Sequence, residues 1–128
     1  MKYLLDTHTL LWAIAEPEKL SKKVLRIVEN LDNEIFASVA NIWEICIKYS
    51  IGKLEFKKDP KEFIRNEILE ADFQILDIKL NHIFPLTGLP YHHKDPFDRL
   101  LISQAQTENT PILSKDPLLK KYKVEVIW

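Results

Sequence analysis

The sequence is poor in residues that would place it outside the cell or in a membrane. It contains one cysteine, Cys46, so it cannot form an intramolecular disulfide. This cysteine is flanked by Ile45 and Ile47 and is predicted to be a core thiol in a reducing compartment. No apolar run approaches the ~20 residues that a membrane span needs. Asp6 interrupts the first apolar run after four residues, too early for a signal peptide. We therefore expect a cytoplasmic protein without membrane association.

The chain also lacks an excess of charge of either sign. Its 18 Lys and Arg against 19 Asp and Glu give a net charge of −1, which argues against a protein that binds polyanions over its whole surface. A nuclease is still possible, because clustered carboxylates can cancel basic residues elsewhere. With only two glycines, few tight flexible loops are possible. The length and ordinary composition predict a single domain spanning residues 1–128.

Short apolar runs alternate with segments of helical periodicity along the chain. The predicted strands are Lys2–Leu5, Glu34–Ala37, Phe73–Leu76, Pro111–Ser114 and Val124–Ile127. The predicted helices begin at Asp6, Ser21, Ser38, Asp59, Lys79, Asp95 and Asp116. This alternation predicts an α/β domain with a mostly parallel central sheet flanked by helices on both faces.

The stretch His92–Ala105 is the most informative part of the sequence. Asp95 stands before Pro96, an arrangement typical of an N-cap followed by the first helical residue, and Asp98 follows in the first turn. Capping alone could explain both acids, at roughly 0.5–2 kcal/mol for a cap. The alternative is that they belong to a functional site at the mouth of a buried helix.

Two further acids follow predicted strands. Asp6 ends the first strand, and Asp116 follows the fourth by two residues. Ligands of open α/β sheets bind at the carboxyl ends of the strands, where the strand order reverses. The Asp95/Asp98 pair is expected near the same edge. Each of these aspartates could instead be a cap.

The helix from Ser38 to Ile51 is almost entirely apolar and is predicted to be buried. Its exceptions, Asn41, Glu44 and Lys48, are spaced by three and four residues and form one polar stripe. The stripe should face either solvent or a polar cleft. Glu44 is therefore a further candidate acid, although Glu44 and Lys48 could also be a surface ion pair.

Other candidates are weaker. Asp59 precedes Pro60 but lies beside no strand end, so it is predicted to be a cap only. His92 and His93 lack a cysteine or a third histidine at a spacing suited to a transition metal, which favours loop or substrate-lining roles.

Several carboxylates in one cleft need a positive partner. Two carboxylates ~5 Å apart, at an effective dielectric constant of ~20, repel each other by roughly 3 kcal/mol. Hard oxygen ligands suit Mg²⁺ or Mn²⁺. Carboxylates that hold such ions are typical of phosphodiester hydrolysis.

The sequence resembles the PIN-domain ribonucleases and, within them, the VapC-type toxins of toxin–antitoxin pairs. The similar segments are Leu4–Trp12, Ser38–Leu54, His93–Ala105, Leu113–Asp116 and Val126–Trp128. The resemblance implies a PIN-like fold and a Mg²⁺- or Mn²⁺-dependent endoribonuclease that cuts RNA. It also implies a homodimer and a cognate antitoxin protein.

Carried over residue by residue, the resemblance places the catalytic and metal-binding acids at Asp6, Glu44, Asp98 and Asp116. It makes Asp95 an accessory acid and Thr7 and Ser114 polar neighbours of the metal. Arg99 also matches the pattern, either as an ion pair with a site carboxylate or as a phosphate contact.

Three alternatives stay open from the sequence. A nuclease of RNA maturation would share all these features. A phosphatase or phosphotransferase could use Asp6 as its nucleophile, but His8 stands where such enzymes place a second aspartate. A non-catalytic binding module could also have this fold.

Overall fold

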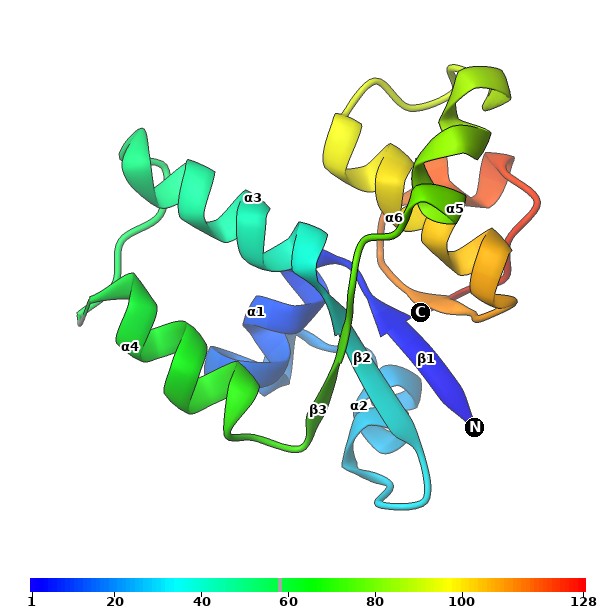
Figure 1. Ribbon diagram of the computed structural model, residues 1–128. Helices are drawn as coiled ribbons and strands as arrows, with labels where there is room; N and C mark the ends of the chain where they lie inside the picture. The colour runs from blue at the N-terminus through cyan, green and yellow to red at the C-terminus, as the bar shows by residue number, and fades with distance from the viewer. Residues whose placement is uncertain (58) are drawn as a thin grey trace.

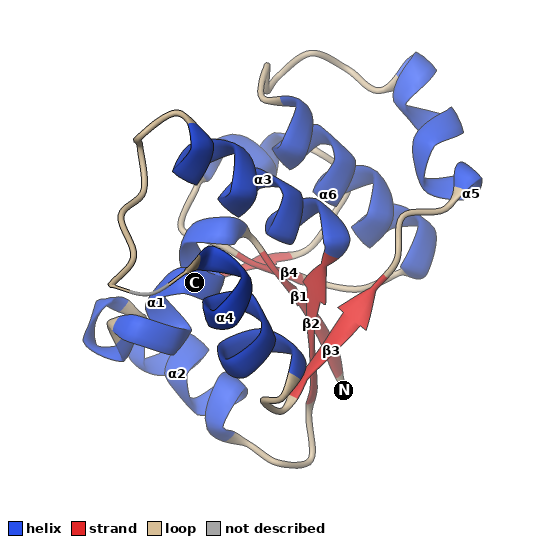
Figure 2. Ribbon diagram, turned by 60° about the vertical axis from the view of Figure 1, so that its left-hand side comes forward, coloured by secondary structure: helices blue, strands red, loops and turns tan. Residues whose placement is uncertain are grey.

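A parallel β-sheet forms the centre of the molecule (Figures 1 and 2). The structure, a computed structural model, describes residues 1–57 and 59–128, and within them the sheet has five strands in the order β3-β2-β1-β4-β5. Every pair of neighbouring strands is parallel. The strands are β1 (Lys2–Leu5), β2 (Glu34–Ser38), β3 (Phe73–Leu76), β4 (Ile112–Leu113) and β5 (Val126–Ile127).

The helices follow the strands in the predicted alternation. They are α1 (Thr7–Ala15), α2 (Lys22–Glu29), α3 (Val39–Ser50), α4 (Pro60–Ile64), α5 (Leu80–Ile83) and α6 (Pro96–Glu108). A π-helical turn at Arg65–Leu69 continues α4, and a 3-10 turn at Phe84–Gly88 continues α5. A further 3-10 turn spans Pro117–Lys121. The predicted order and type of the elements are confirmed, although the last two strands are shorter than expected.

Side-chain caps fix where most of these helices begin. Asp6, Ser21, Ser38, Asp59 and Asp95 each accept a hydrogen bond from a backbone N–H in the first turn of the helix that follows. Asp59 accepts from the Lys61 N–H at 2.8 Å, as the sequence predicts for a cap.

Both faces of the sheet are covered, which confirms the predicted layers. Along β1, Tyr3 and Leu5 point into one core, formed with α1, α2, α3 and α4, whereas Leu4 points into a second core built mainly on α6. Figures 1 and 2 show α1, α2 and α4 on one side of the sheet and α5 and α6 on the other. Burial on both faces explains why the central strand β1 is continuously apolar after Lys2 rather than alternating.

The strand order creates one reversal point. From the central strand β1 the chain moves outward through β2 and β3, and then returns to place β4 on the other side of β1. The gap between the carboxyl ends of β1 and β4 is therefore the position where a ligand site is expected.

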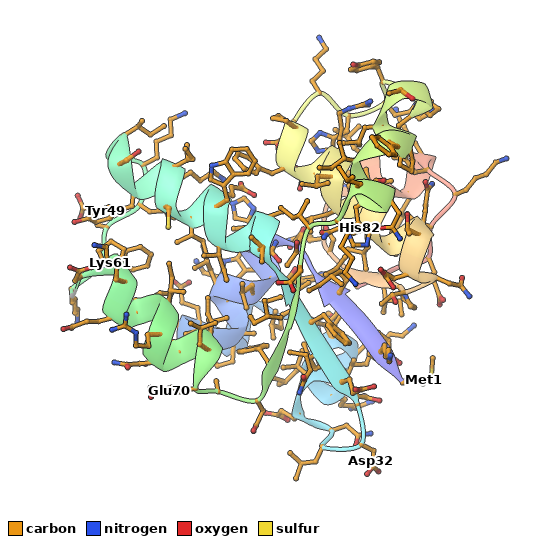
Figure 3. The ribbon with its side chains drawn as sticks, in the orientation of Figure 1. Met1, Asp32, Tyr49, Lys61, Glu70 and His82 are labelled. Atoms are coloured by element: carbon orange, nitrogen blue, oxygen red, sulfur yellow. The ribbon has the colours of Figure 1, made fainter. Side chains whose placement is uncertain are left out.

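The predicted burial of α3 is wrong on its outer face. Trp43 is 52% exposed, and Ile47, Tyr49 and Ile51 are also exposed. Figure 3 shows Tyr49 near the outer end of the helix. Cys46 lies on the exposed surface as well, so the prediction of a core thiol is corrected. The helix turns its polar stripe inward instead: Asn41 and Glu44 are buried.

The contact between α5 and α6 is partly polar. His82, labelled in Figure 3, is fully buried between α5 and α6. Its Nε2 lies 2.7 Å from a carboxylate oxygen of Glu108, and its backbone carbonyl accepts a hydrogen bond from the Ser103 hydroxyl. These bonds join α5 to the core helix α6.

A buried polar seam links α6 to the start of α3. The Ser38 hydroxyl donates to Gln104 Oε1 at 2.6 Å, and the Gln104 amide donates to the carbonyl of Asp77 at 3.2 Å. The side chains of Ser38 and Gln104 are fully buried. Since buried polar groups are costly when they lose their partners, this seam fixes the distance between two elements that carry acids.

We expect Gln104→Ala to lower the free energy of unfolding by about 1–3 kcal/mol, because it leaves the Ser38 hydroxyl and the Asp77 carbonyl without this partner. Urea denaturation measures the change. The control is Gln106→Ala, since Gln106 is exposed and makes only a 3.4 Å hydrogen bond to Lys123. Equal stability of the two variants would contradict a structural role for the seam.

Candidate active site

Asp6 is positioned at the carboxyl end of β1 by hydrogen bonds to both of its side-chain oxygens. Its Oδ1 accepts from the Thr9 N–H at 2.8 Å and caps α1, and its Oδ2 accepts from the Ser114 hydroxyl. Ser114 Oγ in turn accepts from the backbone N–H of Asp116 at 3.0 Å. Ser114 therefore ties Asp6, after β1, to Asp116, after β4.

Asp116 also divides its two oxygens between two tasks. Oδ1 caps the 3-10 turn by accepting from the Leu118 N–H at 2.9 Å, and Oδ2 lies 2.9 Å from His93 Nε2. Capping and membership of a site were alternatives for this residue in the sequence. In the structure Asp116 does both: Oδ1 is the cap, and Oδ2 faces His93.

Glu44 enters the same region from α3. Its Oε1 accepts from the Thr7 hydroxyl at 2.7 Å, and Thr7 accepts from the Asn41 side-chain amide at 3.0 Å. Its Oε2 lies 2.7 Å from Lys48 Nζ. The ion pair of Glu44 and Lys48, one of the two alternatives for these residues, is present, but Glu44 is only 4% exposed, so the pair does not lie on the open surface.

The N-terminus of α6 supplies the remaining two acids. Asp95 is the cap, and its Oδ1 accepts from the N–H groups of Phe97 and Asp98 at 2.8 and 3.1 Å. Asp98 uses Oδ2 to contact His93 Nε2 at 3.2 Å. Asp95 therefore orients the turn from which Asp98 extends.

His93 lies closer to the acids than the sequence predicted. It lies in a loop, as predicted, but its ring joins Asp98 and Asp116. One potential metal-ligand atom from each of these three side chains lies within 4.8 Å of the others. The only local signal was its position two residues before the cap Asp95. Its contact with Asp116 depends on tertiary structure, which spacing does not reveal.

Arg99 takes neither of the two roles considered for it. Its guanidinium is almost completely buried and donates to the backbone carbonyls of Leu89 and Pro90 at 3.0 and 2.8 Å. It also stacks 3.8 Å above the ring of Tyr91. Arg99 therefore holds the loop before α6.

The carboxylates influence one another electrostatically. Burial, followed by the negative charges of Asp95, Glu44 and Asp6, raises the pKa of Asp98 to about 7 against the lowering effect of His93. Glu44 and Asp6 thus act on Asp98 through space, although neither belongs to the tight group around His93.

This donor set fits a hard divalent cation. Carboxylate oxygens are the ligands that Mg²⁺ and Mn²⁺ prefer, and a cation would stabilise the charged form of Asp98, which burial and the neighbouring carboxylates disfavour. Asp6, Glu44, Asp98 and Asp116 are the residues that could hold it.

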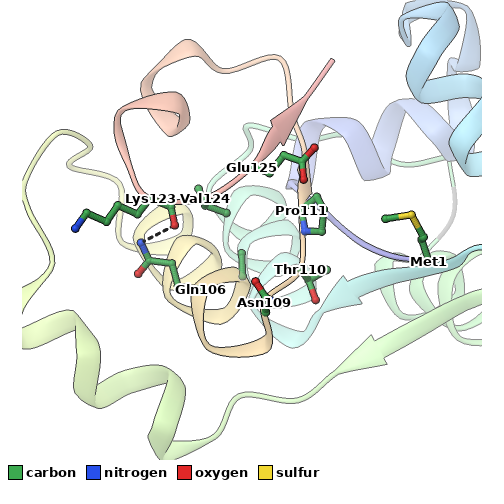
Figure 4. A pocket seen from close by; sticks show the side chains of 9 residues that line it. Met1, Gln106, Asn109, Thr110, Pro111, Lys123, Val124 and Glu125 are labelled. Atoms are coloured by element: carbon green, nitrogen blue, oxygen red, sulfur yellow. Dashed lines mark hydrogen bonds between the residues drawn. The ribbon is translucent and has the colours of Figure 1, made fainter.

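A hollow elsewhere on the surface is not part of this cluster. It has a volume of about 660 Å³ and is lined by residues from Met1, the end of α6 and the segments before β4 and β5 (Figure 4). These residues precede the strands, whereas the acids follow them or lie on the helices at their carboxyl ends.

The comparison of the sequence with protein families decides the classification. The model of the PIN domain matches residues 3–125. The chain belongs to the PIN domain family. No curated protein sequence matches it.

Several solved structures have the same fold. VapBC2 from Rickettsia felis bound to a promoter DNA fragment is similar with a TM-score of 0.76 and 19% identity, over 100% of this chain and 99% of that one. FitAcB from Neisseria gonorrhoeae has a TM-score of 0.70 and 14% identity, with 98% and 96% covered. VapBC-1 from nontypeable Haemophilus influenzae has a TM-score of 0.68 and 16% identity, with 99% and 97% covered. At these identities the likeness concerns the fold, and this PIN domain shares it along nearly its whole length.

The raised pKa of Asp98 predicts that metal-free stability falls with rising pH. The unfolded carboxyl loses its proton near the ordinary value of 3.8 and the folded one only near 7. Between these values the folded state alone retains the proton, so the free energy of unfolding should decrease by roughly 2–4 kcal/mol from pH 4 to above 7.

Urea denaturation in EDTA at pH 5 and pH 8 measures this fall. Asp98→Asn should lack the part of it that Asp98 contributes, whereas Asp59→Asn, which changes a capping carboxylate, should follow the wild type. Parallel pH profiles for wild type and Asp98→Asn would refute the assignment.

Proposed function

We propose that this PIN domain is a metal-dependent endoribonuclease that acts as the toxin of a toxin–antitoxin pair. The observation that carries the proposal is the convergence of acids from separate elements on the reversal point of the sheet, where burial and the neighbouring carboxylates together raise the pKa of Asp98 to about 7. Such a cluster is costly for stability and is typical of a site that binds a cation and a phosphate.

In this proposal Asp6, Glu44, Asp98 and Asp116 hold Mg²⁺ or Mn²⁺ and are the catalytic acids. When bound, the ion supplies a polarised phosphate and a more acidic water. Ser114 and Thr7 hold Asp6 and Glu44 in fixed orientations through their hydroxyl groups. Asp95 fixes the first turn of α6, so that Asp98 points toward the other acids.

An aromatic pair beside the acids supports RNA as the substrate. The exposed ring of Trp43 contacts Phe97 edge to face, with centroids 5.0 Å apart, and each is the chain neighbour of a proposed catalytic acid. Unpaired bases of single-stranded RNA stack on exposed aromatic side chains. Trp43 would thus place a base next to the scissile phosphate.

Two observations support protein partners. The structures of similar fold include VapBC complexes from three bacteria, two of them with bound DNA. The apolar outer surface formed by Ile47 on α3 and Ile51 directly after it is exposed and is suited to contact with another protein chain. We propose a cognate antitoxin and a homodimer.

A cytoplasmic location is part of the proposal. Cys46 is a free exposed thiol, a state that persists in a reducing compartment. In the described part of the chain, no helix has the length and apolar character required to cross a bilayer.

The phosphatase alternative is not supported by the surroundings of Asp6. Such enzymes place a second aspartate two residues after the nucleophile, where this chain has His8. The hydrogen bonds from the Thr9 N–H and the Ser114 hydroxyl orient the Asp6 carboxylate and leave each oxygen a lone pair for a ligand.

We expect Asp6→Asn, Glu44→Gln, Asp98→Asn and Asp116→Asn each to abolish RNA cleavage, because each removes a charge from the proposed ion site. The assay follows cleavage of a mixed RNA pool by purified protein with Mn²⁺ or Mg²⁺. Asp59→Asn, a cap away from the site, should keep full activity. Cleavage that persists in EDTA would contradict metal dependence, and full activity of any one acid variant would remove that residue from the site.

Production of the wild-type chain alone in bacteria should arrest growth, whereas Asp98→Asn should not, because the proposed toxicity depends on cleavage. Growth curves after induction provide the measurement, with immunoblots to equalise protein levels. Normal growth with abundant, active wild-type enzyme would favour a nuclease of RNA maturation.

A further inference from the structure

The loop before α6 is anchored unusually firmly for a surface loop. Arg99 donates three hydrogen bonds to the loop, including one to the His93 carbonyl at 3.4 Å. In addition, the Tyr122 hydroxyl donates to the Pro90 carbonyl at 2.7 Å. The same hydroxyl accepts from the backbone N–H of His93 at 2.8 Å. These contacts fix the main chain on both sides of Tyr91 and bring His93 to the acids.

The hydrogen bonds of the His93 ring determine which nitrogen carries the proton. Nδ1 accepts from the backbone N–H of Asp95 at 3.1 Å, so in the neutral ring the proton is on Nε2. Nε2 faces two acceptors, Asp116 Oδ2 at 2.9 Å and Asp98 Oδ2 at 3.2 Å. The ring is therefore a donor aimed between two carboxylates and has no free nitrogen for a metal ion.

We propose that His93 is a positioning residue that fixes Asp98 and Asp116 in the orientation needed to bind the ion. The inference rests on the proposed function only in so far as these acids bind a metal. Groups that hydrogen-bond to ligating carboxylates orient them, and their removal typically weakens metal binding by about 10–100-fold. Arg99 and Tyr122 act one step further away by holding the loop.

Two amide substitutions separate the donor role from a local role in the loop. In His93→Asn the side-chain oxygen can still accept from the Asp95 N–H, but the side chain is too short to reach the acids. In His93→Gln the amide N–H reaches the former position of Nε2. Both replacements are uncharged, and they differ by one methylene group.

Binding of Mn²⁺ alone, followed by electron paramagnetic resonance of the free ion at pH 8, tests the inference without RNA. We expect His93→Asn to bind Mn²⁺ about 10–100-fold more weakly than wild type and His93→Gln to recover most of that loss. His92→Asn is the matched control and should bind as wild type, because His92 is exposed and its ring packs in a T-shaped contact with Tyr122, with centroids 5.1 Å apart. Melting temperatures in EDTA verify that all three variants are folded.

Unchanged binding in His93→Asn, equal losses in both His93 variants, or absence of Mn²⁺ binding by the wild type would each overturn the inference. Equal losses would indicate that the imidazole itself is required, as a ligand would be. If Mn²⁺ binding follows the expected order while no RNA is cut, the positioning role stands and the proposed nuclease function fails. If RNA is cut and both variants bind as wild type, only the positioning role fails.

Discussion

The burial of several carboxylates close to one another is the constraint on which the site depends. Burial first, and then the negative charges of its neighbours, raise the pKa of Asp98 to about 7. Each of the other acids has its own donors: Ser114 for Asp6, Thr7 and Lys48 for Glu44, and His93 for Asp116. The donors keep the acids in place without neutralising all of their charge, which leaves the cluster suited to a cation.

Two of the acids are oriented by the same hydrogen bonds that begin the helical segments after them. Asp6 and Asp116 each use Oδ1 as a cap and Oδ2 within the cluster. Since a cap fixes the side-chain torsion angles, each acid is already oriented once its helix has formed. The parallel sheet then brings the two strand ends together, as the pairing of β1 with β4 requires.

Much of this was predictable from local patterns. Apolar runs, caps such as Asp95 before Pro96, and the polar stripe of α3 were sufficient for the α/β fold with helices on both faces and for the candidate acids. The stripe was correctly identified, but the burial of its helix was not, because apolar periodicity cannot distinguish a face against the core from a face such as that of Trp43 and Cys46 that remains exposed.

The contacts of His93 and Arg99 could not be predicted for a different reason. Both depend on where the loop before α6 passes relative to β4 and Tyr122, a long-range property of the fold. Charge alone favoured a phosphate or carboxylate partner for Arg99, whereas backbone carbonyls of the loop satisfy it. Sequence spacing does not reveal which backbone carbonyls of a loop need a side-chain donor.

The most direct test of the account is the melting temperature of wild type and Asp98→Asn at pH 8, each in EDTA and in millimolar Mn²⁺. If the acids share one cation site, Asp98→Asn melts above wild type in EDTA, because one repelling charge is gone. Mn²⁺ then raises the melting temperature of wild type strongly and that of the variant much less, since an ion bound only by the folded state stabilises it. A variant that melts below wild type in EDTA, with equal shifts on adding Mn²⁺, would contradict the account and leave Asp98 as a residue of the helix end alone.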